Sequence, residues 1–192
     1  MIGNDIIDIN ETKLKTNWQR QGFLNKIFTD QEQELINEAK DSFLKVWRLW
    51  SIKESAYKAN MQYDITRKIN PTKIECRIIN SQSAIVNIGE KRYIASTLQT
   101  EEYIYSYASE ELQVHSFHSI TNEKSSDILH QSISCRNSLI RTLSEKLSIN
   151  KNEVVINKST FGQPQVYHLN KKLDTSISLT HHGKYSAYSI VY

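Results

Sequence analysis

Hydrophobic and polar positions alternate with two periods along this chain, and the two periods predict where strands and helices lie. The chain opens on a segment, residues 1–10, that predicts a buried strand interrupted by two carboxylates. Thr29 and Glu32 have the spacing of a capping box that opens a helix, and a second helix is expected from about residue 42 to residue 60. Four short alternating segments follow, at residues 74–79, 84–88, 93–98 and 103–108, and polar turns between them favour an antiparallel meander.

The second part of the chain has a similar order of elements. A short strand is expected at Val114–Phe117 between two polar stretches, and apolar residues then recur at helical spacing from Leu129 to Leu147. Further strands are expected at residues 153–157, 165–169, 176–180 and 184–192. The predicted class is α+β, with two similar subdomains at residues 1–112 and 113–192, although no repeat of individual residues demonstrates a duplication.

Composition narrows the class of protein. The 192 residues carry a net charge of +3, which is too small to indicate a nucleic-acid partner. No apolar run has the length of a membrane span, and carboxylates stand near the start, where a signal peptide would be basic and then apolar. Two distant cysteines provide neither a disulfide framework nor a zinc-binding Cys-x-x-Cys pair. We therefore expect a cytoplasmic protein without a membrane or nucleic-acid partner.

Two carboxylates occupy positions where the local pattern predicts hydrophobic residues. Strand alternation places Asp5 on the face of Ile7 and Ile9, while helical periodicity places Glu54 at the centre of an aromatic stripe that Lys58 borders. Taken singly, Asp5 could cap backbone amides at a strand end, and Glu54 could pair with Lys58 one turn later. Taken together, they favour a small site in which carboxylates hold Mg²⁺ and the lysine meets phosphate. The absence of a Cys/His cluster argues against zinc.

Histidines are a second source of candidate chemistry. His181 and His182 follow an alternating strand, where they could face a cleft or form a polar turn, and the spacing leaves both interpretations open. His115 and His118 would lie on opposite faces of a strand, so we expect them to be structural or surface residues. The sequence has no glycine-rich phosphate loop, so a bound phosphate would depend on metal, side chains and helix ends.

These segments, read together, resemble the signature motifs of the 4′-phosphopantetheinyl transferases. The resemblance rests on IGNDIID at residues 2–8, FTDQE at residues 28–32, WSIKESAYK at residues 50–58 and SISLTHHGKY at residues 176–185. The motif order is that of the short, trimeric holo-acyl-carrier-protein synthases. The length and the tail instead resemble the long, surfactin-type enzymes. The resemblance therefore implies a monomeric pseudo-dimer whose halves stand in swapped order, with the active site between them.

The resemblance also implies an activity and its residues. The family transfers the phosphopantetheine arm of coenzyme A to a serine of an apo acyl or peptidyl carrier protein, in fatty acid, polyketide or peptide synthesis, and releases 3′,5′-ADP. Asp5 and Glu54 would hold Mg²⁺ at the pyrophosphate, and Lys58 would contact the same phosphates. Glu54, or a water on the metal, would accept the serine proton. His181, together with Arg141, would hold the nucleotide phosphates.

Two departures from the long type affect the expected site. An acidic residue two positions after the metal aspartate is replaced by Ile7; Asp8 follows it and should face away from Asp5. Gln163 stands where the long type has a basic residue, which leaves nucleotide contacts there open. The alternatives are a catalytically silent relative that binds coenzyme A or a carrier protein, and a metal-dependent nuclease or phosphoesterase. The second would need more clustered carboxylates than this chain shows.

Overall fold

The computed structural model describes residues 1–63, 70–110, 116–123 and 127–192. They form an α+β fold built on antiparallel sheets, as the sequence predicts. The helices are α1 (Ile9–Lys15), α2 (Phe23–Ile27), α3 (Asp30–Asn37), α4 (Ser42–Met61) and α5 (Ile128–Leu147). The strands are β1 (Ile2–Asp8), β2 (Ile74–Ile78), β3 (Ser83–Ile88), β4 (Lys91–Gln99), β5 (Tyr103–Ser109), β6 (Ser116–Asn122), β7 (Val154–Lys158), β8 (Pro164–His168), β9 (Lys171–Lys172), β10 (Ser176–His182) and β11 (Tyr185–Val191). Short 3₁₀ helices, η1 (Pro71–Lys73) and η2 (Lys151–Glu153), precede β2 and β7.

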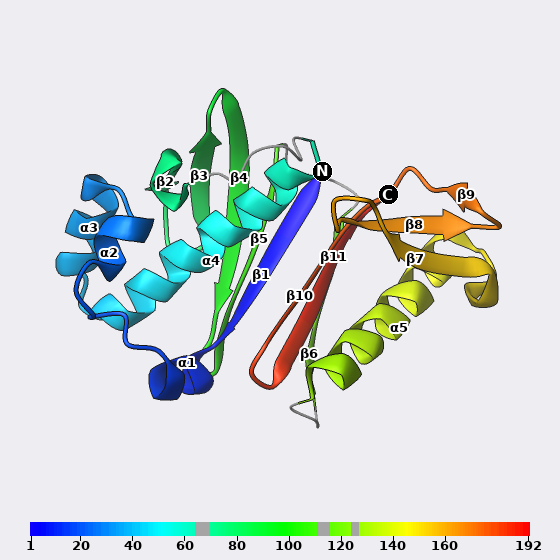
Figure 1. Ribbon diagram of the computed structural model, residues 1–192, viewed down its shortest axis with the longest axis horizontal. Helices are drawn as coiled ribbons and strands as arrows, with labels where there is room; N and C mark the ends of the chain where they lie inside the picture. Colours follow the sequence, from blue (N-terminus) through cyan, green and yellow to red (C-terminus); the bar gives the residue numbers. More distant parts are fainter. Residues whose placement is uncertain (64–69, 111–115, 124–126) are drawn as a thin grey trace.

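The first half is a five-stranded antiparallel sheet, in the order β1-β5-β4-β3-β2, with α4 packed across it (Figure 1). The side chain of Asp41 begins α4 by accepting a hydrogen bond from the amide of Leu44. The predicted capping box of Thr29 and Glu32 is present and begins α3. Apolar residues of α4, α2, α3 and the sheet share one buried core, which fixes α4 relative to β1.

β1 is buried along its whole length and lies against α4 at backbone distance. Gly3 makes this approach possible: a Cβ at that position would lie 2.0 Å from the backbone oxygen of Ser55 and 2.5 Å from the amide nitrogen of Ala59. Any side chain at position 3 would therefore push α4 away from the strand. The close approach brings the part of α4 that carries Lys58 next to Asp5 on β1.

The second half repeats the main elements of the first, without counterparts of α1–α3 and with β9 added. β6, α5, β7, β8, β10 and β11 follow one another as β1, α4, β2, β3, β4 and β5 do. Most of the pairing agrees, because β11 lies between β6 and β10 as β5 lies between β1 and β4, and β7 pairs with β8 as β2 pairs with β3. The halves differ in that β3 also pairs with β4, whereas β8 pairs with β9 in a separate three-stranded sheet. The helix α5 covers a separate apolar core of this half. The prediction of two similar subdomains is confirmed; their predicted boundary, residues 112 and 113, lies outside the described residues.

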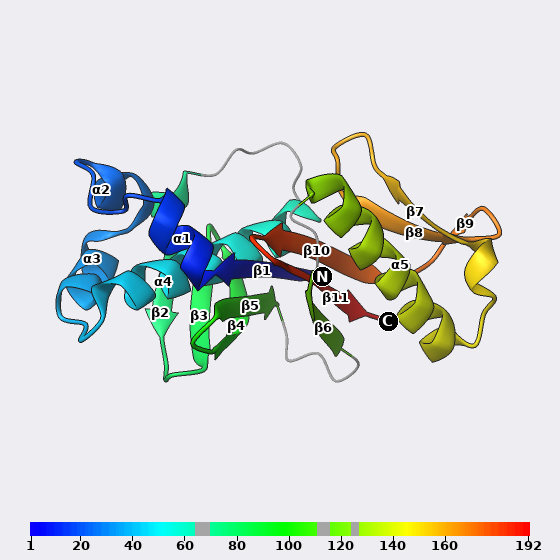
Figure 2. The same cartoon turned by 90° about the horizontal axis from the view of Figure 1, so that it is seen from below.

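The two halves meet along β1 and β10, which lie side by side at the centre of the molecule (Figures 1 and 2). Backbone amides of β1 donate to polar side chains of β10: Ile2 to Ser176 Oγ at 2.9 Å, Asn4 to Ser178 Oγ at 3.0 Å and Asp8 to His182 Nδ1 at 2.9 Å. These acceptors lie on one face of β10, and that face packs against the first half.

A buried polar cluster also joins the halves. The hydroxyl of Tyr105 on β5 lies 2.7 Å from Ser189 Oγ on β11, and Nδ1 of His118 on β6 lies 2.9 Å from the same oxygen. The His118 ring stacks on Tyr107 with 3.8 Å between the ring centres. Burial lowers the pKa of His118 to about 4, so the imidazole is neutral near pH 7. The expected structural role of His118 is in keeping with these contacts, and His115 lies outside the described residues.

Two predicted boundaries need correction. The strand expected at Val114–Phe117 continues to Asn122 as β6, because the polar residues after Phe117 pair with β11. Val114 itself lies outside the described residues. β10 continues through His181 and His182, which were expected to follow the strand. Among the described residues, no helix combines the length and apolar character that crossing a membrane requires.

Candidate active site

An ion pair between Asp5 and Lys58 lies where the two halves meet. Nζ of Lys58 is 3.0 Å from Oδ1 of Asp5 and 2.9 Å from the backbone oxygen of Asn4. The hydroxyl oxygen of Thr180 is 3.4 Å from both Asp5 Oδ1 and Lys58 Nζ. Side chains from β1 and α4 of the first half therefore meet one from β10 of the second half. The sequence did not single out Thr180 as a site residue. The alternation of polar residues along 176–182 was the signal that could have identified it.

The second carboxylate oxygen of Asp5 has no protein partner. Asp5 is 8% exposed, and its Oδ2 is buried without a hydrogen-bond partner within the described part of the chain. Removing a charged oxygen from water without a donor or a cation is unfavourable. A hard divalent cation is the kind of ligand that would satisfy this oxygen.

Glu54 is the second carboxylate at this point. It is half-buried on α4, one turn before Lys58. Burial raises the pKa of Glu54, the negative charge of Asp5 raises that pKa further, and the positive charge of Lys58 opposes both effects. The two carboxylates thus repel each other across the site, and a cation held between them would remove this repulsion.

The two structural interpretations of these acids, a cap of backbone amides for Asp5 and a pair with Lys58 for Glu54, name the wrong partners. In the described part of the chain, Lys58 pairs with Asp5 and not with Glu54. Asp5 accepts from Lys58 and Thr180 rather than from amides at a strand end. The close approach of β1 to α4 explains the difference, because it places Asp5 within reach of Lys58.

The protein would supply few ligands to a metal. Among the described residues, no group of three or more histidine, cysteine, aspartate or glutamate side chains could hold a metal ion. Asp5 and Glu54 would form a two-carboxylate site, which is typical of Mg²⁺ that keeps several waters and binds substrate phosphates.

His181 faces away from β1, towards α5. It lines a hollow of about 220 Å³ together with Arg136, Lys158 and Gly162, among other residues. Partial desolvation lowers the pKa of His181, and the positive charge of Lys58 lowers it further. Thr180, which contacts Asp5 and Lys58, lines the same hollow. The hollow therefore lies beside the carboxylate site and is lined by cationic side chains from the second half.

Arg141, which was predicted to hold the nucleotide phosphates with His181, lines a different hollow, with Asn137 and Lys151. Arg136 lines the hollow of His181 instead. The two arginines are five residues apart on α5, so their side chains leave the helix about 140° apart. Ser132, Cys135 and Arg136 lie on one face of α5 at helical spacing. The position of each arginine relative to the apolar stripe of this helix was the sequence signal that could have distinguished Arg136 from Arg141.

Asp8 connects the two halves through hydrogen bonds to backbone amides. Its carboxylate caps α1 by accepting from the amide of Glu11 at 3.0 Å and also accepts from the amide of Lys184 at 3.1 Å. Gly183 lies against it with φ of 58°, and a Cβ there would be 2.3 Å from Oδ2 of Asp8. These contacts occupy both carboxylate oxygens of Asp8.

Gln163 also contacts the other half. Its side-chain amide donates to the backbone oxygen of Met61 at the end of α4, and its backbone amide donates to Ser159 Oγ at 3.2 Å. Gln163 thus holds the turn before β8 against α4. Its neighbours Gly162 and Pro164 line the hollow of His181.

Comparison with known proteins identifies the family. The family model of the 4′-phosphopantetheinyl transferase superfamily matches residues 1–114, which is more than half of the chain. The chain therefore belongs to the 4′-phosphopantetheinyl transferase superfamily and is an enzyme of that transferase class.

One curated relative and two solved structures are similar to part of this chain. The chain is 31% identical over 99 residues to the holo-[acyl-carrier-protein] synthase of Mycoplasmopsis pulmonis, covering 52% of this chain and 88% of that protein. Among solved structures, it is similar to the Helicobacter pylori holo-[acyl-carrier-protein] synthase in complex with coenzyme A, with 17% identity, a TM-score of 0.45 and coverage of 56% of this chain and 97% of that one. The holo-ACP synthase of Plasmodium yoelii gives 17% identity, a TM-score of 0.42 and coverage of 56% and 90%.

Proposed function

We propose that this protein transfers the 4′-phosphopantetheine arm of coenzyme A to a serine of an apo acyl or peptidyl carrier protein, in a Mg²⁺-dependent reaction that releases 3′,5′-ADP. The observation that carries the proposal is the buried Oδ2 of Asp5, which has no partner in the described residues and lies beside Lys58 and Glu54. Family membership supports the class of reaction. One chain would contain both halves of the site.

The described residues fit a bound Mg²⁺. Asp5 and Glu54 would hold the ion, since one of them has an unsatisfied buried oxygen and the other has a pKa raised by burial and by its neighbour's charge. The bound ion would neutralise charge on the pyrophosphate as the leaving group departs. Lys58 would place a further positive charge at the same phosphates, held in position by Asp5 and the backbone oxygen of Asn4.

The transfer step requires a nucleophile and a proton acceptor. The serine oxygen of the carrier protein would attack the phosphorus that bears the pantetheine arm, and the bond from that phosphorus to the oxygen of 3′,5′-ADP would break. Glu54, or a water molecule held at the site, would accept the serine proton as the general base. Lys58 would stabilise the negative charge that develops on the leaving phosphate.

A direct assay tests the proposed function. Incubation with an apo carrier protein, coenzyme A and Mg²⁺ should add one phosphopantetheine arm to the carrier, measured by mass spectrometry of the intact protein. Chelation of Mg²⁺ with EDTA should stop the reaction. Binding of coenzyme A without a mass gain on any acyl or peptidyl carrier would instead favour a catalytically silent relative. Hydrolysis of a nucleic acid or phosphoester would favour a metal-dependent nuclease or phosphoesterase.

The hollow of His181 provides a second prediction. Arg136→Gln and His181→Ala should each raise the KM for coenzyme A by about tenfold, because each removes a contact worth about 1.4 kcal/mol to the nucleotide phosphates. Arg141→Gln is the matched control on the same helix and should leave KM unchanged, since Arg141 lines another hollow. Steady-state kinetics with coenzyme A as the varied substrate provide the measurement. A raised KM in Arg141→Gln with none in Arg136→Gln would return the role to Arg141.

A further inference from the structure

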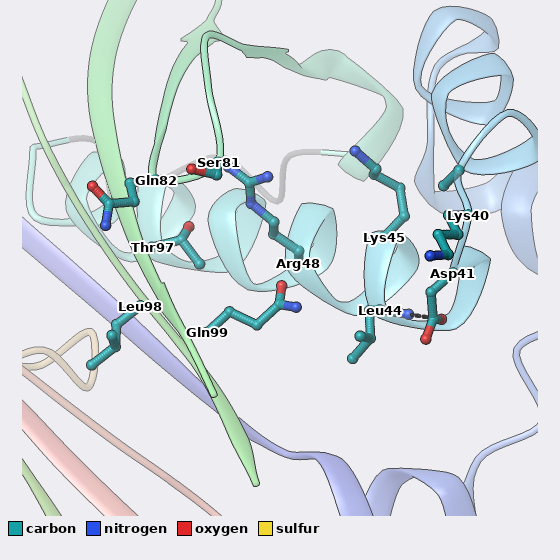
Figure 3. A pocket seen from close by; sticks show the side chains of 11 residues that line it. Lys40, Asp41, Leu44, Lys45, Arg48, Ser81, Gln82, Thr97, Leu98 and Gln99 are labelled. Atoms are coloured by element: carbon teal, nitrogen blue, oxygen red, sulfur yellow. Dashed lines mark hydrogen bonds between the residues drawn. The ribbon is translucent and has the colours of Figure 1, made fainter. Parts of the chain in front are cut away.

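A further hollow lies on a different face of α4 from Glu54. It has a volume of about 520 Å³ and lies between the beginning of α4, the turn from β2 to β3 and the end of β4 (Figure 3). Its charged lining residues are Lys40, Asp41, Lys45 and Arg48. Arg48 and Glu54 are six residues apart on α4, so their side chains leave the helix about 120° apart. This hollow shares no lining residue with the hollow of His181.

Arg48 is a buried cation that lacks a counter-ion. It is 8% exposed, and its Nη2 donates to the backbone oxygen of Asn80 at 2.6 Å. Its Nε is buried without a hydrogen-bond partner in the part of the chain that the structure describes, where Arg48 also forms no ion pair within 4.0 Å. Burial lowers the pKa of Arg48, which is the effect of removing a charged group from water. A guanidinium in this state is unfavourable unless an anion accompanies it.

The other lining charges do not compensate for Arg48. Lys45 lies three residues before Arg48, on the same side of α4, and Figure 3 shows both side chains extending from the helix in the same direction. Asp41 is the one lining carboxylate, and its Oδ1 is engaged in capping α4 at 2.9 Å from the amide of Leu44. The charged lining residues therefore sum to a net charge of about +2, with Lys40 at the rim.

We propose that this hollow binds a small phosphate-type oxyanion, such as inorganic phosphate or a phosphate monoester, with Arg48 as its buried counter-charge and Lys45 beside it. Arginine presents several N–H donors in a planar fork that matches the oxygens of phosphate. The depth of the guanidinium favours a small ion, since a bulky ligand could not approach a side chain that is 8% exposed. The site is separate from the proposed transfer reaction.

Thermal unfolding in inorganic phosphate tests this proposal. At constant ionic strength, replacing chloride by phosphate should raise the Tm of the wild-type protein, by about 3–5 °C at ten times Kd, and the rise should grow with the logarithm of concentration. Arg48→Gln should lose most of this rise. Arg77→Gln, at an exposed arginine of β2, should retain it. An equal rise in Arg48→Gln would overturn the proposal.

A second measurement on the unaltered protein keeps the test independent of folding in the variant. In ¹H–¹⁵N spectra, the Arg48 Nε–H resonance should move on titration with phosphate and saturate at the Kd found by unfolding. Acetate at equal ionic strength should have a smaller effect, and an equal effect would reject the phosphate assignment. An unmoved Arg48 resonance would also reject the proposed site.

Discussion

Asp5→Asn and Glu54→Gln should each lower kcat for phosphopantetheine transfer by about a thousandfold. Each substitution preserves size but removes one of the two charges proposed to hold Mg²⁺, and a thousandfold loss corresponds to about 4 kcal/mol of transition-state stabilisation. Single-turnover transfer to an apo carrier protein, followed by intact-protein mass, gives the rate. Titration with Mn²⁺ should show weakened metal binding in both variants.

The control must separate loss of a ligand from loss of the fold. Glu101→Gln changes an exposed carboxylate in the turn between β4 and β5 and should leave both the rate and the metal affinity unchanged. Thermal unfolding of Asp5→Asn and Glu54→Gln should remain cooperative. Glu54→Gln should be more stable than the wild type without metal, because it removes a carboxylate whose charged form is disfavoured by burial and by Asp5. Wild-type transfer rates in either variant would refute the assigned metal site.

A buried ion pair within the first half should have the largest effect on stability. Nζ of Lys53 lies 2.5 Å from Oε2 of Glu32, with the two side chains 2% and 1% exposed. Lys53 also donates to the backbone oxygens of Ile27 and Pro71, at 2.8 and 3.1 Å. Glu32 accepts from the amide of Cys76 at 2.8 Å. The pair thus connects α4, α3, β2 and the segments that precede α3 and β2.

Lys53→Met should destabilise the protein by about 3–5 kcal/mol, because it leaves the Glu32 carboxylate buried without its counter-ion. The double variant Lys53→Met/Glu32→Gln should recover a large part of this loss, since no unpaired charge then remains. Urea unfolding, with the slope m compared between variants, provides the free energies of unfolding.

The matched control is a lysine in an exposed pair. Lys91 lies 3.7 Å from Glu110, with the two side chains 38% and 32% exposed. Lys91→Met should cost less than about 1 kcal/mol, because water screens the pair. Equal losses from Lys53→Met and Lys91→Met would show that burial of the Lys53 pair does not have the proposed effect on stability.

Local features of the fold could be predicted because their causes are local. The capping box of Thr29 and Glu32 is a contact between residues three apart, and the structure has it. The aromatic and apolar periodicity predicted the long helix that became α4, and alternation predicted the four strands β2 to β5. The second role of Glu32, as the partner of Lys53, depends on the packing of α3 against α4 and has no local signal.

The two acids of the candidate site could be predicted from the sequence, but most of their contacts could not. Asp5 and Glu54 could be singled out because a charge in an apolar pattern is conspicuous, and because each lies in a short motif that resembles the transferase family. Their contacts could not be predicted, because Lys58 and Thr180 reach Asp5 only through the approach of β1 to α4 and to β10. The choice between Arg136 and Arg141 likewise depended on the rotation of α5 about its axis, which the second core fixes.

The sequence by itself determined the order of helices and strands, the two conspicuous acids and the resemblance to a transferase family, since hydrogen bonding and hydrophobic periodicity act between near neighbours. Tertiary structure decided which surfaces meet: β1 with β10 across 174 residues, Lys58 with Asp5, and Arg48 with no carboxylate within ion-pair distance in the described residues. Such pairings depend on how two cores orient their helices and sheets, and no short stretch of sequence contains that information.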